Sequence, residues 1–349
     1  MKISFDSKFS TFIELNSTLD KKLNIDLMSR KALIDQFSLM FQIRIIEQVL
    51  AEKRKSGSIG GPVHLSAGQE AIAVGISKFL RKTDFVLSGH RSHAHLLALG
   101  SDPYKLFAEV LGKSTGLTKG MGGSMHLWDG PNGFYGSVPI VAGSVPLAVG
   151  AALALKMQNR DDIAVAYFGD GAIEEGVIHE SLNLARQLKV PILFVCENNL
   201  FSSHMHISQR QPLQSVSRFS IANDIQTELV DGNNILQVEA AANRLITVAR
   251  NMKLPVFIEA ITYRHYGHVD WRDDIDVGVN RSKADLTLWK SRDPILRLES
   301  ALLEAKIISE SEIIEIKQKI STEIDHAWNK AAEDFQPESS SLFDYLYKA

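Results

Sequence analysis

Two unbroken apolar runs with a helical segment between them constrain the fold of this chain more than any other feature. The runs cover residues 163–168 and 190–196. Continuous apolar runs of this length are typical of strands buried on both faces of a parallel sheet. Apolar residues recur at helical spacing from Ile173 to Leu188, with Glu174 and Glu175 in the expected first turn, where the helix dipole favours negative charge. The pattern predicts a right-handed strand–helix–strand unit.

Two polar side chains stand where these strands are expected to end. Asp170 lies within Gly169-Asp170-Gly171, and Asn199 closes Glu197-Asn198-Asn199. Ligands of open parallel sheets collect outside the carboxyl ends of the strands, so the two side chains are expected to face one crevice. Mg²⁺ takes six oxygens and commonly combines one or two protein groups with phosphates and water. Asp170, the Asn199 carbonyl and the Phe201 backbone carbonyl would supply three, and the flanking glycines would let phosphates approach.

Simpler interpretations of these motifs remain open. A Gly-Asp-Gly sequence alone is more often an ordinary turn, because both residue types suit turn dihedrals. The histidines His90, His93 and His95, and separately His204 and His206, have the number of ligands for a zinc cluster. No cysteine or carboxylate stands beside them at a structural-zinc spacing, which disfavours zinc. The same histidines fit better as charged or hydrogen-bonding contacts to a diphosphate than as zinc ligands.

Several motifs in the same order resemble one enzyme family. Gly169–Gly171 with Asn198-Asn199 is similar to the thiamine diphosphate motif, and the surrounding sequence resembles the alpha subunit of the two-subunit 2-oxo acid dehydrogenases, the pyruvate, acetoin and branched-chain group. The resemblance runs from about Leu33 to Tyr347. The supporting segments are Val63–Ala71, His90–His93, Gly120–Leu127 and Tyr263–His268.

The resemblance implies roles for individual residues. The implied catalytic residues are His268, His64 and His93. The implied contacts to the cofactor are His90, Arg91, Pro139, Val141, Gly169, Asp170, Gly171, Ala172, Asn199, Arg264 and His268. The implied metal ligands are Asp170, Asn199 and the carbonyl of Phe201. For each histidine the alternative is a hydrogen-bonded structural role, and for the loop 139–143 it is a tight start of the following helix.

The chain also departs from the family pattern. His90 stands where relatives often have tyrosine, Ala94 replaces a common glycine, and Phe201 replaces a frequent tyrosine. Val269 follows His268 where the mitochondrial pyruvate enzymes carry a regulatory serine, so phosphorylation there is not expected. The stretch 270–280 is acidic and lacks a family likeness, which leaves the substrate class open.

The resemblance further implies a reaction and partners. Thiamine diphosphate with Mg²⁺ would act on a 2-oxo acid or acetoin, and the acyl group would pass to the lipoyl group of a separate acyltransferase. The family's pyrimidine-side glutamate belongs to a beta subunit, so we expect a heterotetramer of two alpha and two beta chains that is inactive without beta. Rival interpretations are a transketolase-like or non-lipoyl thiamine enzyme subunit, and a non-catalytic diphosphate-binding scaffold.

Composition limits the remaining alternatives. The formal net charge of −3 gives no electrostatic case for nucleic acid. The single cysteine, Cys196, excludes an internal disulfide framework and fits a reducing compartment. No stretch approaches the ~20 apolar residues of a membrane span, and the first residues lack a signal-peptide core. The sequence therefore predicts a cytoplasmic protein.

The whole chain is expected to form an α/β fold with a doubly wound, mostly parallel sheet flanked by helices, the thiamine diphosphate-binding fold. We expect an N-terminal arm at 1–28, the binding domain at 29–290, and a C-terminal helical segment with a docking tail at 291–349. Further strands are expected near 84–87 and 255–261. Helices are expected at 30–54, at 144–156, after Asp293-Pro294 through Leu298, and from Ser309. Ser309 and Glu312 have capping-box spacing.

Overall fold

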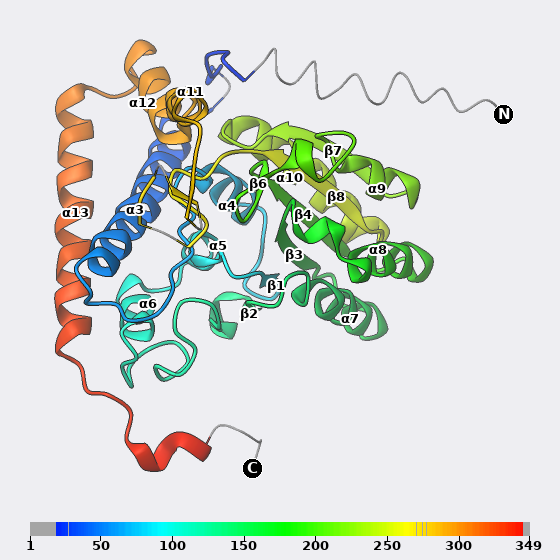
Figure 1. The fold of residues 1–349 in the computed structure, drawn as a ribbon. Helices are drawn as coiled ribbons and strands as arrows, with labels where there is room; N and C mark the ends of the chain where they lie inside the picture. The colour runs from blue at the N-terminus through cyan, green and yellow to red at the C-terminus, as the bar shows by residue number, and fades with distance from the viewer. Residues whose placement is uncertain (1–18, 27, 270, 274, 277, 345–349) are drawn as a thin grey trace.

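The computed structural model describes residues 19–26, 28–269, 271–273, 275–276 and 278–344. Residues 1–18 and 27 of the expected arm lie outside these residues, and so do residues 345–349 of the expected tail. Figure 1 shows a central sheet with helices on both sides and a further helical layer beyond one of them.

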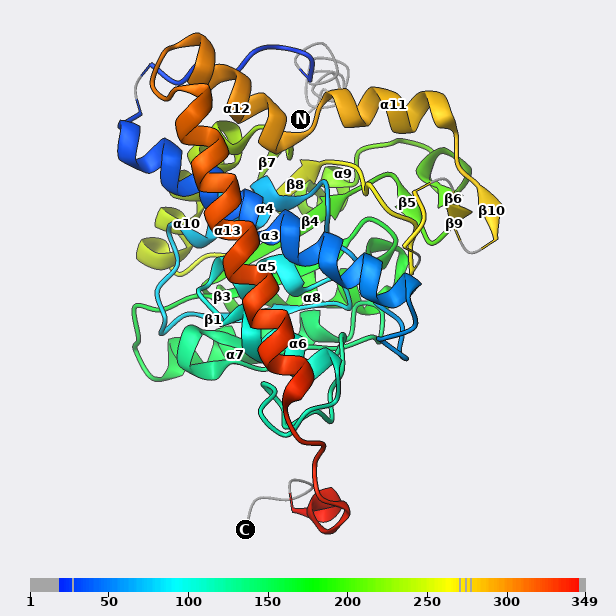
Figure 2. The ribbon, with the colours of Figure 1, turned by 90° about the vertical axis from the view of Figure 1, so that its left-hand side faces the viewer.

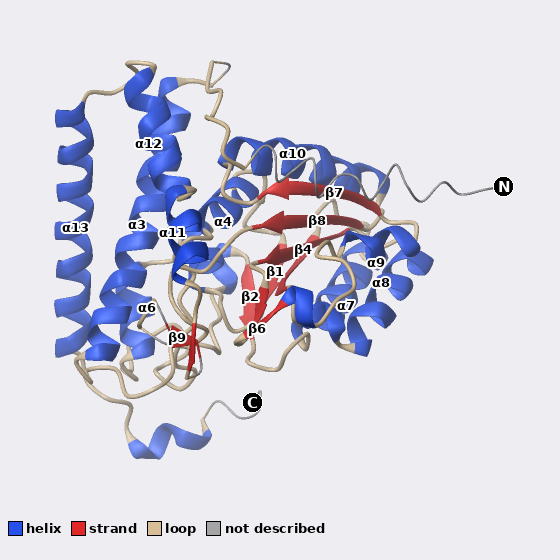
Figure 3. Ribbon diagram, turned by 45° about the horizontal axis from the view of Figure 1, so that its top comes forward, coloured by secondary structure: helices blue, strands red, loops and turns tan. Residues whose placement is uncertain are grey.

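The main sheet has six strands that are parallel throughout, in the order β2-β1-β3-β4-β8-β7. Figure 3 shows these strands as one twisted layer between helices. Two short antiparallel pairs lie outside it, β5 with β6 and β9 with β10. The strands are β1 (Phe85–Ser88), β2 (Phe134–Ser137), β3 (Ala164–Gly169), β4 (Ile192–Asn198), β5 (Phe201–Ser202), β6 (Met205–His206), β7 (Gln226–Asp231), β8 (Val256–Ile261), β9 (Ile275–Asp276) and β10 (Val279–Asn280).

Alternate residues of the central strands enter two different cores, because successive strand side chains point to opposite faces. On β3, Val165 and Tyr167 join the core shared with α3, α4 and α10, whereas Ala164, Ala166 and Phe168 join the core shared with α7 and α8. This double burial explains why the strand sequences are apolar without alternation.

The helices cover both faces of the sheet and form the outer layer. They are α3 (Arg30–Lys55), α4 (Glu70–Ser77), α5 (His93–Ala98), α6 (Pro103–Val110), α7 (Ser144–Met157), α8 (Gly176–Leu188), α9 (Ser217–Ala222), α10 (Ile235–Met252), α11 (Lys283–Ser291), α12 (Pro294–Glu304) and α13 (Glu310–Glu333). Short 3₁₀ turns are η1 (Gly130–Asn132), η2 (Ala172–Glu174), η3 (Ile207–Gln209) and η4 (Ser339–Phe343). None of the helices within the described ranges combines the length and apolarity that a membrane crossing requires.

The C-terminal helix α13 packs along α3 and α6, and Figure 2 shows it crossing both. The ring centroids of Trp328 and Phe107 lie 5.3 Å apart in this layer. Buried residues of α12 and α13 belong to the same core as α3 and α4. Beyond α13 the chain leaves the body of the molecule, and Phe343 in η4 is 72% exposed. Docking of the tail, on this chain's own surface or on a partner, stays a prediction.

The parallel sheet and the strand–helix–strand unit are confirmed, and one helix boundary is wrong. The helix expected from Ile173 begins at Gly176, after the turn η2, and Glu175 is its N-cap residue. Glu174 is therefore not in the first turn of α8. Its side chain accepts hydrogen bonds from Arg210 and Gln211 instead, and these contacts hold the chain in the preceding turn.

We expect Ser309→Ala to destabilise the protein, because the capping box predicted from spacing is present. The Ser309 hydroxyl accepts from the Glu312 N–H, and the Glu312 carboxylate accepts from the Ser309 N–H. Loss of such a cap costs about 0.5–2 kcal/mol. Urea unfolding of this variant and of Ser321→Ala, inside the same helix, measures the difference. Equal free energies of unfolding in the two variants would contradict the capping role.

Candidate functional site

A cavity of about 380 Å³ opens at the carboxyl ends of β1, β3 and β4. This is the edge of the sheet where ligands of such folds collect, and the volume lies in the usual range for small-molecule sites. Residues expected from the sequence line much of its wall, namely His64, His90, Arg91, Pro139, Val141, Gly169, Gly171, Ala172, Asn199, Phe201 and His268. These residues come from segments far apart in the sequence, and the fold brings them together.

Asp170 lies beneath this wall rather than on it. The residue is fully buried, between Gly169 and Gly171, which both line the cavity. One carboxylate oxygen, Oδ2, accepts a hydrogen bond from Arg210, and the other, Oδ1, has no partner among the described residues. Burial raises the pKa of this carboxyl, and the Arg210 charge opposes the rise. A buried carboxylate oxygen without a partner is costly, so this atom is suited to a cation.

Asn199 stands on the wall beside Asp170, at the end of β4. Its Oδ1 accepts from the Phe201 N–H at 3.2 Å, and its Nδ2 donates to Gln69 Oε1 at 3.3 Å. These two contacts fix which side of the amide carries the oxygen, and a carbonyl oxygen retains a second lone pair. Asn199 is therefore oriented to offer oxygen to a ligand at the same edge where Asp170 lies.

The turn after β3 leaves room for a close approach to the backbone. A Cβ added at Gly169 would meet no atom within 4 Å, and Gly169 lines the cavity. At Gly171 an added Cβ would lie 2.7 Å from the Ser202 Cβ, so a side chain there would displace the segment that carries Phe201. One glycine keeps space for phosphate oxygens, and the other lets the two edge segments approach each other.

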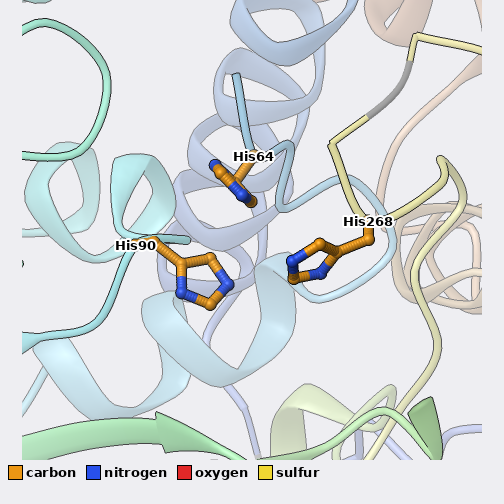
Figure 4. Close-up of side chains that lie close together, drawn as sticks. All are labelled: His64, His90 and His268. Atoms are coloured by element: carbon orange, nitrogen blue, oxygen red, sulfur yellow. The ribbon is translucent and has the colours of Figure 1, made fainter. Parts of the chain in front are cut away.

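Three histidines converge in the cavity, as Figure 4 shows. The ring centroids lie 4.5 Å apart for His64 and His90, 5.0 Å for His64 and His268, and 5.2 Å for His90 and His268. Burial, reinforced by the Arg91 charge, lowers the pKa of His90 to about 3 and that of His268 to about 2, and lowers the pKa of His64 strongly. All three rings are therefore neutral near pH 7 and able to accept or donate hydrogen bonds.

The zinc alternatives drawn from the sequence do not match this geometry. Among the described residues, the histidines close enough to share a metal are His64, His90 and His268, whose ligand atoms lie within 4.8 Å of one another. His93 and His95 point elsewhere, because their ring nitrogens bond within the protein. The Arg91 guanidinium adjoins this cluster of three histidines, and its positive charge disfavours binding of Zn²⁺ there.

Arg91 supplies positive charge to the cavity without a carboxylate partner of its own in the described part of the chain. Its guanidinium donates to the carbonyl oxygens of Leu65, at 2.6 Å, and His268, at 3.1 Å. Burial and the charge of Arg264 lower its pKa to about 9, so it stays cationic at neutral pH. A buried cation whose contacts here are backbone carbonyls and a neutral histidine ring is available to an anionic ligand.

Besides Asp170, the structure places two of the expected site residues away from the cavity wall. His93 is fully buried, with Nδ1 3.2 Å from Glu47 Oε1 and Nε2 2.9 Å from Ser124 Oγ. Arg264 is 1% exposed and donates to Asp276 at 2.8 Å and to the Ser203 carbonyl at 2.9 Å. Both side chains hold neighbouring segments, and a direct role in catalysis or cofactor contact stays a prediction.

Several residues of the site were not expected from the sequence, and three of them bear on its chemistry. Gln69 and Glu197 line the cavity, and Arg210 bonds to Asp170. Gln69 lies inside the segment Val63–Ala71 and Glu197 inside Glu197-Asn198-Asn199, so membership of these two motifs was the available signal. Arg210 lies in a polar loop with no recognisable pattern, and only the folded chain brings it to the site.

We expect the cofactor-free protein to lose stability as the pH falls below about 6.5, the pKa of an unfolded-state histidine. The unfolded chain binds protons there, whereas native His90 and His268 do so only near pH 3 and pH 2. Each such group contributes a slope of up to about 1.4 kcal/mol per pH unit. Urea unfolding between pH 7 and 5 should show a shallower decline in His90→Phe. His326→Gln, which replaces an exposed histidine, is the control. If His90→Phe shows the same slope of stability against pH as this control and the wild type, this account is contradicted.

Comparisons with known proteins find a matching family and several relatives. The model of the family described as Dehydrogenase E1 component matches residues 38–340. The alpha subunit of acetoin:2,6-dichlorophenolindophenol oxidoreductase of Bacillus subtilis (strain 168) is 35% identical over 328 residues, covering 94% of this chain and 96% of the relative. Pyruvate dehydrogenase E1 component subunits alpha of Rhizobium meliloti and Porphyra purpurea are 33% and 32% identical, covering 87% and 96% of this chain and 86% and 97% of those relatives.

Proposed function

This chain belongs to the dehydrogenase E1 component family, and from that premise we propose that it is the alpha subunit of a thiamine diphosphate-dependent 2-oxo acid or acetoin dehydrogenase. One observation carries the proposal. A buried carboxylate with an unpartnered oxygen, Asp170, lies beside the oriented amide of Asn199 at a cavity that also holds the Arg91 charge. That combination fits a divalent cation bridging the protein to a diphosphate.

The donors present fit Mg²⁺ and a diphosphate. Asp170 and Asn199 would hold the metal through oxygen, together with the Phe201 backbone carbonyl proposed from the sequence. Arg91 would face the diphosphate, and the open space at Gly169 would admit its oxygens. Pro139 and Val141, which line the same cavity, would contact the organic part of the cofactor. All of these donors are hard oxygen atoms or cations, which suits Mg²⁺ and phosphate rather than a thiophilic metal.

Thiamine diphosphate, when bound, supplies the nucleophilic carbon and the electron sink that cleavage beside a carbonyl group requires. The residues of this chain would orient the substrate and form hydrogen bonds with it. His64, His90 and His268, neutral in the cavity, would donate to or accept from the substrate's polar atoms. Arg91 donates from Nη2 toward His268 Nδ1 at 3.4 Å, which would leave the proton of a neutral His268 on Nε2.

A partner subunit would complete the site. Exposed apolar side chains adjoin the cavity, with Ile140 71%, Val141 47% and Leu147 59% exposed. Apolar side chains gathered in this way mark surfaces that a partner covers. We propose that a beta subunit covers them, in an assembly of two alpha and two beta chains that passes the acyl group to a lipoyl acyltransferase. The same proposal places the protein in the cytoplasm.

Calorimetric titration of the chain, alone and with a co-expressed beta-type subunit, tests the cofactor. Thiamine diphosphate should bind in the presence of Mg²⁺ and lose affinity when EDTA removes the metal. A screen of 2-oxo acids and acetoin with a dye acceptor, and then with lipoylated acyltransferase, would assign the substrate and acceptor. Metal-independent binding, or no binding in either preparation, would contradict the proposal.

A further inference from the structure

Arg210 bridges two carboxylates behind the cavity wall. Its Nη2 donates to Oδ2 of Asp170, and its Nη1 donates to Oε1 of Glu174. Its Nε donates to the Met205 carbonyl oxygen at 3.1 Å, so all three nitrogen positions of the guanidinium are engaged. The Arg210 side chain is only 6% exposed. The contact with Asp170 is therefore formed largely out of water, where charge-assisted hydrogen bonds are strong and directional, whereas the Glu174 end of the bridge is 30% exposed.

This bridge makes the two oxygens of Asp170 unequal. Oδ2 is occupied by Arg210, whereas Oδ1 is buried without a hydrogen-bond partner in the described residues. Metal-binding carboxylates are commonly oriented by a neighbouring group that hydrogen-bonds to them. Mg²⁺ demands near-octahedral geometry, whereas Ca²⁺ accepts more oxygens and tolerates both oxygens of one carboxylate. An arginine that occupies one oxygen of the pair thus favours the smaller ion.

We propose that Arg210 is a positioning residue of the metal site: by occupying Oδ2 of Asp170 it leaves Oδ1 as a single oxygen ligand and selects Mg²⁺ over Ca²⁺. The inference rests on the proposed magnesium–diphosphate site and names the residue that determines its ion selectivity. Arg210 itself touches neither the metal nor the substrate.

Glu174 removes the main objection, which is that a cation beside a metal ligand repels the metal. The Glu174 carboxylate neutralises the Arg210 charge, so the group of three keeps one net negative charge for the incoming ion. Gln211 Nε2 donates to the same Oε1 of Glu174 at 2.9 Å and fixes it in place. The position of Glu174 in the turn before α8, rather than in that helix, follows from these contacts.

Titration of two cations tests the proposal. The complex with a co-expressed beta-type subunit is saturated with thiamine diphosphate, and Mg²⁺ and Ca²⁺ are titrated separately in a calorimeter. Arg210→Gln should weaken Mg²⁺ binding about 10–100-fold, the usual cost of losing such an orienting partner. It should weaken Ca²⁺ binding less, so the ratio of the two affinities should fall. Arg186→Gln, which removes an ion pair with exposed Asp224, should leave both affinities unchanged.

The outcomes separate this inference from the proposed function. Wild-type protein that binds neither cation with thiamine diphosphate would contradict the proposed function. Wild-type binding together with unchanged affinities and an unchanged ratio in Arg210→Gln would contradict the positioning role alone. Tighter Mg²⁺ binding in the variant would make Arg210 a competitor of the metal and would also overturn it. If Arg210→Gln does not fold, Glu174→Gln should show the same fall in the ratio at smaller amplitude, and an unchanged ratio there would overturn the role.

Discussion

Asp170→Asn is expected to weaken Mg²⁺-dependent thiamine diphosphate binding by more than about 100-fold and to abolish activity with it. Loss of a residue that only orients a metal ligand lowers metal affinity about 10–100-fold. Asp170 would bind the metal directly, and it is the only charged ligand among those proposed. The replacement keeps the size of the side chain and an oxygen for Arg210. The cofactor-free variant should therefore fold, and calorimetric titration at several Mg²⁺ concentrations measures the loss.

The matched control is Asp224→Asn, which also removes a carboxylate paired with an arginine. Asp224 is exposed and pairs with Arg186 at the far end of α8. Cofactor affinity should not change in this variant. Wild-type affinity in Asp170→Asn, with the protein folded, would exclude Asp170 as a metal ligand.

The second large effect concerns the partner. The purified chain alone is expected to turn over substrate at less than about 1% of the rate of its complex with a beta subunit. The glutamate that the family resemblance places on the beta subunit would act as a proton-transfer group, and such groups are worth about 10²–10⁴-fold. Rates at saturating thiamine diphosphate and Mg²⁺, with a beta-type subunit titrated in, measure the dependence. The rate should rise until the two chains are equal in number.

Full activity of the chain alone would contradict the need for a partner. It would direct attention to Glu197, the carboxylate that this chain itself places on the cavity wall. The Glu197 Oε1 lies 3.2 Å from His95 Nε2, and the His95 ring stacks on Tyr167 at 3.8 Å. These contacts fit a carboxylate held inside its own subunit. Glu197→Gln in the complex, compared with the wild type, would then assign its role.

The sequence sufficed for the parts of the fold that follow from local pattern. Apolar runs predicted β3 and β4 because both faces of these strands are buried, and Ser309 with Glu312 predicted the start of α13. The long helix α10 was not predicted, although its apolar residues such as Val238 and Leu245 recur at helical spacing. The edge strands β2 and β7 were also missed, because their short runs mix apolar and polar residues.

The candidate site also has residues whose positions the sequence predicts and residues whose positions it does not. The positions of Asp170, Asn199, Arg91 and His268 could be predicted because a strand end or a motif fixes each of them. Neither the spacing nor the motif reveals that His93 turns its ring nitrogens to Glu47 and Ser124 instead of the cavity. That choice depends on which polar groups the helix α5 meets when it packs.

Arg210 shows most clearly which contacts the sequence does not predict. It lies 40 residues beyond Asp170 in the chain, and the residues around it in the sequence do not indicate an ion pair. Only the short pair β5–β6 and the turn η3, which return the chain toward the end of β3, bring its guanidinium to the carboxylate. Contacts of this kind depend on loop geometry, which has no simple sequence periodicity.

A crystal structure of the complex with thiamine diphosphate and Mn²⁺ tests the central claim most directly, because anomalous scattering locates the metal without reference to the protein. The account predicts one manganese peak within coordination distance of Asp170 Oδ1 and Asn199 Oδ1 and next to the diphosphate, with Arg210 on the other oxygen of Asp170. A manganese peak elsewhere, or a bound diphosphate with neither side chain on its metal, would contradict it.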